Sequence, residues 1–279
     1  MHSKNVAIIN MKGGVGKTTL SYNLAMELYE KNKKVLLIDL DPQANASILV
    51  LSEEEYAAHK ANKKTIADLF INCFKRFGPF DKPRGLEETA FDNRLLLHRK
   101  LFNQNGGYLD IIPSEISLGL ILKGAHVNPY ILEEMLKQEM FQQYDYILVD
   151  CAPTYSILTN IALNATKKVL IPVNADSFAI YGVKLMKEII NDHEEDFDTK
   201  VGIAGLVFVK WKTKNPVNQT ECEKKIIPEW GETVFNTRIR ESDYYKIANG
   251  MRIPVTDTRM SAEAKQELLD FVKEFEIAV

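Results

Sequence analysis

An eight-residue segment near the start of the chain has the composition of a phosphate-binding loop. Its members are Lys12, Gly13, Gly14, Val15, Gly16, Lys17, Thr18 and Thr19. Glycines let backbone N–H groups close around phosphate oxygens, and a helix that begins there adds the partial positive charge of its N-terminus. We expect Lys17 to reach the β- and γ-phosphates of a nucleotide and the Thr18 hydroxyl to face Mg²⁺.

Three carboxylates stand where apolar, strand-like segments end. Asp39 and Asp41 follow the run Val-Leu-Leu-Ile, and Asp150 closes the run Ile-Leu-Val-Asp. Ligands of α/β sheets bind outside the carboxyl ends of parallel strands. Two neighbouring carboxylates repel each other and favour a bound cation or a polarised water. An apolar strand that ends in aspartate is typical of an Mg²⁺ site in phosphoryl-transfer enzymes, which predicts that role for Asp150.

The elements that must position these residues alternate along the chain. Short, continuous apolar runs predict buried parallel strands, and they occupy residues 5–10, 35–39, 147–150, 169–173 and 201–209. Helical periodicity fits residues 18–31 and 177–192. This alternation predicts an α/β fold, a doubly wound and mostly parallel sheet with helices on both faces. We expect one domain over residues 1–279, with a looser insertion of helices and loops at about 52–107.

The composition excludes several protein classes. The 279 residues are 46% hydrophobic and 26% charged, which argues against general disorder. With 35 basic and 38 acidic residues the net charge is −3, so this is no polycation. The three cysteines form no CxxC pair, which disfavours a zinc knuckle or a disulfide framework. No apolar targeting segment opens the chain and no run could span a bilayer, so we expect a cytoplasmic protein.

The phosphate loop departs from the common pattern, which would place a glycine at position 11. Met11 stands there and a second lysine, Lys12, follows. This deviant Walker A form resembles the ParA/MinD superfamily of dimerising P-loop ATPases. The resemblance implies that ATP and Mg²⁺ bind, that a homodimer forms on ATP binding, and that Lys12 contacts the partner's nucleotide. It makes Lys12, Lys17 and Asp41 the catalytic residues.

The segment around Asp41 also resembles the superfamily's D-x-D-P-Q-G-N-A stretch, with Ala44 in place of the usual glycine. By this resemblance Asp41 orients the attacking water, and Asp39 supports the loop and the Mg²⁺ shell. The predicted metal-site residues are therefore Thr18, Asp39 and Asp150. The loop after Asp150, residues 152–156, is a candidate switch that senses the γ-phosphate.

Further stretches resemble the ParA/Soj partition ATPases in particular. They are L-D-I-I-P-S from Leu109, V-L-I-P-V-N-A-D from Val169, and the block around residues 234–255. The resemblance implies non-specific binding of double-stranded DNA, nucleoid association, and a ParB-like partner that stimulates weak intrinsic ATP hydrolysis. The cargo, whether plasmid, chromosome or protein assembly, stays open.

A modest excess of basic residues supplies candidates for the DNA contacts. Between residues 210 and 259 there are ten basic and seven acidic residues. The candidates are Lys210, Lys212, Lys214, Arg238, Arg240 and Arg252, while Trp211 could stack on a base or cover an adenine. Two alternatives remain. A MinD-like membrane-positioning ATPase is disfavoured by the acidic C-terminal helix expected at 261–278, which should pack onto the body. A metal- or cluster-assembly ATPase is disfavoured by the cysteine spacing.

Overall fold

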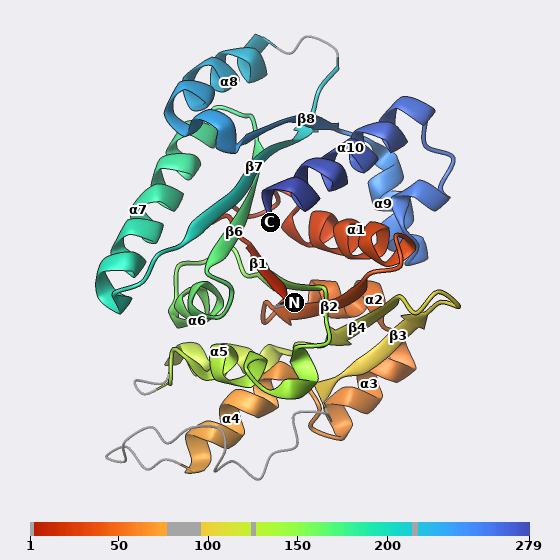
Figure 1. The fold of residues 1–279 in the computed structure, drawn as a ribbon, viewed down its shortest axis with the longest axis vertical. Coiled ribbons are helices and arrows are strands. Elements are labelled where there is room, and N and C mark those ends of the chain that lie inside the picture. Colours follow the sequence, from red (N-terminus) through yellow and green to blue (C-terminus); the bar gives the residue numbers. More distant parts are fainter. Residues whose placement is uncertain (1–2, 77–95, 124–126, 214–216) are drawn as a thin grey trace.

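The structure is a computed structural model that describes residues 3–76, 96–123, 127–213 and 217–279. In this part of the chain an eight-stranded sheet has the order β3-β4-β2-β5-β1-β6-β7-β8, with helices on both faces (Figure 1). The strands are β1 (Lys4–Ile8), β2 (Lys34–Leu40), β3 (His98–Phe102), β4 (Tyr108–Ile112), β5 (Tyr146–Cys151), β6 (Lys168–Asn174), β7 (Gly202–Trp211) and β8 (Val234–Arg240).

All neighbouring strands run parallel except β3, which is antiparallel to β4. The doubly wound, mostly parallel sheet predicted from the sequence is thereby confirmed. Asp150 is the register partner of Ile8 on one side and of Asp39 on the other. The ends of β1, β2 and β5 therefore meet at one edge of the sheet, beside the loop that follows β1.

Two layers of helices cover the sheet. Buried residues of α1, α2, α9 and α10 form one core, and those of α4, α5, α6, α7 and α8 belong to the other. The helices are α1 (Lys17–Glu30), α2 (Asn45–Val50), α3 (Glu53–Ala61), α4 (Ile66–Arg76), α5 (Ile131–Leu136), α6 (Ile157–Thr166), α7 (Ala179–Phe197), α8 (Val217–Trp230), α9 (Asp243–Met251) and α10 (Ala262–Ala278). Successive strand residues enter opposite cores, as Leu37 and Ile38 do.

Helix α10 packs onto the body as its sequence predicts. Leu268, Phe271 and Phe275 are fully buried against the sheet. Two of its acidic residues bind β8, since Glu267 pairs with the Arg240 guanidinium and Glu274 accepts hydrogen bonds from β8 backbone N–H groups. The acidic face of this helix therefore fastens it to the neighbouring strand.

The expectation of only helices and loops at 52–107 was wrong in one respect, because strand β3 lies there. It forms the antiparallel edge of the sheet and is fastened to α3 by side chains. The His98 Nδ1 lies 3.0 Å from the His59 Nε2, and the Lys100 ammonium donates to Glu55 at 2.8 Å. Residues 77–95 of this insertion lie outside the described residues.

Candidate nucleotide-binding site

The predicted phosphate loop connects β1 to α1. Gly14 and Gly16 have φ of 72° and 100°, a left-handed region that L side chains rarely adopt. A Cβ at either position would meet no atom within 4 Å, so the requirement is conformational rather than steric. Asn10 braces the loop, since its Oδ1 accepts from the Lys12 N–H at 2.9 Å and its amide donates to the Pro172 carbonyl at 2.8 Å.

Lys17 is the first residue of α1 and lies inside the loop with 6% of its surface exposed. Its ammonium donates to the Lys12 carbonyl at 3.2 Å. Burial lowers the pKa of Lys17, and the charges of Asp150 and Asp41 act in the opposite direction. A desolvated cation at the N-terminus of a helix is suited to bind an anion, and phosphate binding by Lys17 stays a prediction.

Asp150 is the second-to-last residue of β5, close to the loop residues Lys17 and Thr18, and is fully buried. Its Oδ1 accepts from the Ser21 hydroxyl at 2.9 Å, whereas its Oδ2 is buried and has no hydrogen-bond partner among the described residues. Burial raises the pKa of Asp150 to about 6, although the hydroxyls of Thr18 and Ser21 and the charge of Lys17 oppose that rise. A buried carboxylate oxygen without a partner is costly unless a cation or donor arrives.

Asp39 is also fully buried, but both of its oxygens are occupied. Its Oδ2 accepts from the N–H and hydroxyl of Ser47 at 2.8 and 2.7 Å, and its Oδ1 accepts from the Asp41 N–H at 3.1 Å. Burial and the charge of Asp150 raise the pKa of Asp39 to about 7. These contacts are those of a residue that shapes the loop after β2, whereas metal ligation by Asp39 stays a prediction.

Asp41 lies in that shaped loop and faces the same cavity as the phosphate loop. It is 6% exposed, and its Oδ1 accepts from the Gln43 N–H at 2.9 Å. Ala44 follows with φ of 55°. This left-handed conformation explains why the resembling motif has glycine there, and alanine adopts it here at a steric cost.

Lys12 turns away from its own loop. Its ammonium forms an ion pair with Asp176, which follows β6, and lies 5.9 Å from the centre of the Phe178 ring. Burial raises the pKa of Asp176, but the hydrogen bonds from Lys12 and the Phe178 N–H outweigh burial and lower it overall. Lys12 is thus held within its own subunit by a partly exposed ion pair with Asp176.

The cavity over the loop has a volume of about 610 Å³ and extends to β7, β8 and α9. The side of the cavity opposite the phosphate loop, formed by β7, β8 and α9, was mostly not predicted from the sequence. It consists of Val209, Lys210, Ile239, Arg240, Glu241, Ser242, Asp243, Tyr245, Lys246 and Asn249. Asn249 closes the wall against the loop, because its amide donates to the Thr19 hydroxyl at 3.1 Å while its Oδ1 is buried without a partner among the described residues. The sequence indicates the block at 234–255 for its resemblance to partition ATPases and for its basic residues, but not as part of a nucleotide cavity.

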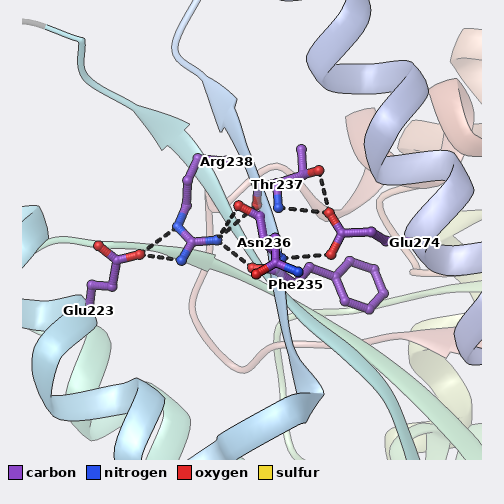
Figure 2. A network of polar contacts seen from close by, with 6 residues as sticks. All are labelled: Glu223, Phe235, Asn236, Thr237, Arg238 and Glu274. Atoms are coloured by element: carbon purple, nitrogen blue, oxygen red, sulfur yellow. Dashed lines mark hydrogen bonds and ion pairs between the residues drawn. The ribbon is translucent and has the colours of Figure 1, made fainter.

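The arginines predicted to contact DNA lie in ion pairs within the fold. The Arg238 guanidinium donates to Glu223 and to three carbonyls of β8, while Glu274 accepts from backbone N–H groups of the same strand (Figure 2). Arg240 donates to both oxygens of Glu267 at 2.7 to 3.0 Å. Both residues fasten β8 to neighbouring helices, and their charges are already matched.

The remaining candidates are spread over several places. Lys210 donates to the Gly14 carbonyl at 2.6 Å and so belongs to the nucleotide cavity. Lys212 is exposed, and Arg252 lies 3.8 Å from Glu53. Lys214 is outside the described residues. Trp211 is not among the cavity residues and packs edge to face on Phe208.

Comparison with known proteins places this site in a family. The model of a family described as AAA domain matches residues 3–203. The sporulation initiation inhibitor protein Soj of Bacillus subtilis is 32% identical over 97% of both chains. The chromosome-partitioning ATPase Soj of Treponema pallidum is 30% identical over 91% of this chain and 89% of its own.

A solved structure of an McdA–ATP complex from Cyanothece has the same fold. It superimposes with a TM-score of 0.74 at 22% identity and covers 99% of this chain and 95% of its own. No helix among the described residues combines the length and apolar composition needed to cross a membrane. With its phosphate loop, its buried strand-end carboxylates and these relatives, the chain belongs to the ParA/Soj family of P-loop ATPases.

Proposed function

We propose that this protein is a Mg²⁺-dependent ATPase that dimerises on ATP, binds DNA without sequence preference and positions a cargo together with a ParB-like partner. The observation that carries the nucleotide part is the Oδ2 of Asp150, which is buried beside Thr18 and Lys17 and has no hydrogen-bond partner among the described residues. The partition part is supported by the relatives, one of which is named a chromosome-partitioning ATPase.

The residues present fit MgATP. The loop offers backbone N–H groups and a buried lysine to the phosphates, and Asp150 offers a free carboxylate oxygen. The described residues contain no group of three His, Cys, Asp or Glu side chains that could hold a metal alone. Mg²⁺ in nucleotide sites needs only one or two carboxylates plus phosphates and waters. We therefore expect it to bind with the nucleotide, held by Thr18 and Asp150, where it neutralises phosphate charge.

The chain's own residues divide the work of hydrolysis. Lys17 and the N-terminus of α1 stabilise negative charge on the phosphates, and this is the main electrostatic contribution. Asp41 is placed in the same cavity to accept a hydrogen bond from the attacking water. Asp39 positions Asp41, since it accepts the hydrogen bond from the Asp41 backbone N–H.

Dimerisation would expose Lys12 to a second nucleotide. Lys12 is bound to Asp176 in the single subunit, and this contact has side-chain exposures of 30% and 38%. Such a pair contributes about 1 kcal/mol or less, so a phosphate with several charges can displace it. In the proposed dimer each Lys12 leaves Asp176 and contacts the nucleotide of the partner subunit.

DNA binding would rest on basic side chains that are not tied up in short ion pairs within the fold. Arg238 and Arg240 are matched by Glu223 and Glu267 in short, half-buried ion pairs. The better candidates among the described residues are Lys212, which is exposed, and Arg252, whose pair with the exposed Glu53 is longer at 3.8 Å. Phosphate contacts by such side chains are independent of sequence and weaken with salt. We expect the dimer to place the basic side chains of both subunits on one DNA duplex, so that two weak sets of phosphate contacts act together.

Binding to random-sequence duplex DNA tests the proposal. It is measured with MgATP, with MgADP and without nucleotide, across a salt series from about 50 to 200 mM. We expect binding only with MgATP, a steep loss with salt, and no binding by Lys12→Ala. Equal binding in all three nucleotide states, or none in any, would remove DNA partition while leaving the ATPase assignment intact.

A further inference from the structure

A third lysine, far from the phosphate loop in sequence, enters the nucleotide cavity. Lys210 lies near the end of β7, and its ammonium donates to the carbonyl of Gly14 at 2.6 Å. Gly14 stands between Lys12 and Lys17 in the loop. The contact therefore brings a positive charge from β7 to the loop that is built to receive phosphates.

The backbone around Lys210 is held from two sides. Gln219 of α8 is buried, and its side-chain amide donates to the Lys210 carbonyl at 3.3 Å while its Oε1 accepts from the Lys212 N–H at 3.0 Å. The Trp211 carbonyl accepts from the Glu241 N–H at 2.9 Å. These bonds hold the strand end against both of its neighbours.

Lys210 itself has φ of 54°, in the left-handed region. A non-glycine residue there is uncommon and breaks the regular alternation of side chains along a strand. Such conformations persist where the surroundings determine them, and they concentrate at functional sites. The left-handed residue and its fixed neighbours explain why this side chain lies along the carboxyl edge of the sheet.

The charge of Lys210 is also the least compensated of the three. Lys12 is paired with Asp176, and Lys17 has Asp150 and Asp41 nearby. Within the described residues Lys210 takes part in no ion pair, and its hydrogen bond to Gly14 occupies one of its three N–H donors. An ammonium that binds only a neutral carbonyl, at the mouth of a phosphate loop, keeps donors for an anionic ligand.

We propose that Lys210 is a further phosphate ligand of the nucleotide, contributed by β7 rather than by the loop motif. This inference rests on the proposed nucleotide site and deepens it. Lys210 then raises the affinity of this chain for nucleotides with a charged phosphate chain. Its place in the cavity also removes it from the DNA contacts expected from the sequence.

The test compares Lys210→Met with Lys224→Met, an exposed lysine on α8 outside the cavity. Isothermal titration of each folded variant with MgATP and with adenosine reports affinity directly. Loss of one charge-assisted hydrogen bond predicts that Lys210→Met binds MgATP about tenfold more weakly, with adenosine unaffected. Lys224→Met should match the wild type.

Each result separates the possibilities. If the wild-type protein fails to bind MgATP, the proposed function and this inference both fall. If the wild type binds and Lys210→Met binds within about twofold of it, only the role of Lys210 is refuted. DNA binding at saturating MgATP, where the variant and the wild type are both fully loaded, tests the second part of the proposal: Lys210→Met should bind DNA like the wild type, and weaker binding would show that Lys210 contacts DNA.

Discussion

Replacing Asp176 by asparagine should strengthen ATP-dependent dimerisation, because it weakens the contact that holds Lys12 within its own subunit. Asparagine keeps an oxygen for the Phe178 N–H, which Asp176 binds at 3.0 Å, so the local turn is preserved. What changes is the charge opposite Lys12. In the proposed dimer Lys12 leaves Asp176, so the wild-type protein must break this ion pair whereas the variant does not.

The size of the effect follows from the exposure of the pair. With side chains 30% and 38% exposed, the pair is partly screened by solvent. It therefore contributes about 0.5 to 1 kcal/mol. Two subunits release two pairs, so the dimer gains about 1 to 2 kcal/mol, or about 5- to 30-fold in its dissociation constant.

Sedimentation equilibrium with a non-hydrolysable ATP analogue measures this constant directly. Asp270→Asn is the matched control, since Asp270 accepts from Lys273 at 2.9 Å in an exposed pair on α10, away from the loop. An unchanged or weaker dimer of Asp176→Asn, with Asp270→Asn equal to the wild type, would refute the view that Asp176 restrains Lys12.

Three further predictions concern the fold. A Cβ at Gly205 would lie 2.2 Å from the Cε1 atom of Phe235 in β8. Gly205→Ala should therefore lower the free energy of unfolding by about 1 to 3 kcal/mol in urea titrations. Gly202→Ala, whose nearest contact is 3.4 Å away, should not. Arg238→Met should cost about 1 to 3 kcal/mol in the same assay, because it leaves Glu223 and three carbonyls without their donor. Burial lowers the pKa of His98, so the folded state resists its protonation, and the free energy of unfolding should fall as the pH drops below about 6.5. If a His98→Gln variant loses as much melting temperature on acidification as the wild type does, this prediction is contradicted.

The local chemistry of the site could be predicted from the sequence because it is contiguous. The phosphate loop needs glycines, a lysine and a threonine in one short segment, and Asp150 ends an apolar run that reads as a strand. The doubly wound sheet follows from the same alternation of runs. Strand β3 was missed because its residues are only partly buried and form no apolar run.

The partners of the charged residues could not be predicted, because they come from distant segments. Lys12 and Asp176 are 164 residues apart, and Lys210 and Gly14 are 196 apart. A count of basic residues shows only that Arg238 and Arg240 contribute to a local excess of positive charge. Only the packing of α8 and α10 shows that Glu223 and Glu267 already match them.

The mass of the protein in solution tests the central claim most directly. Light scattering after size exclusion is recorded with MgADP and with a non-hydrolysable MgATP analogue, for the wild type and for Lys12→Ala. We predict a monomer with MgADP, a dimer with the ATP analogue, and a monomer in both conditions for Lys12→Ala. A Lys12→Ala protein that dimerises like the wild type, or a wild type of one mass in both nucleotides, would contradict the account.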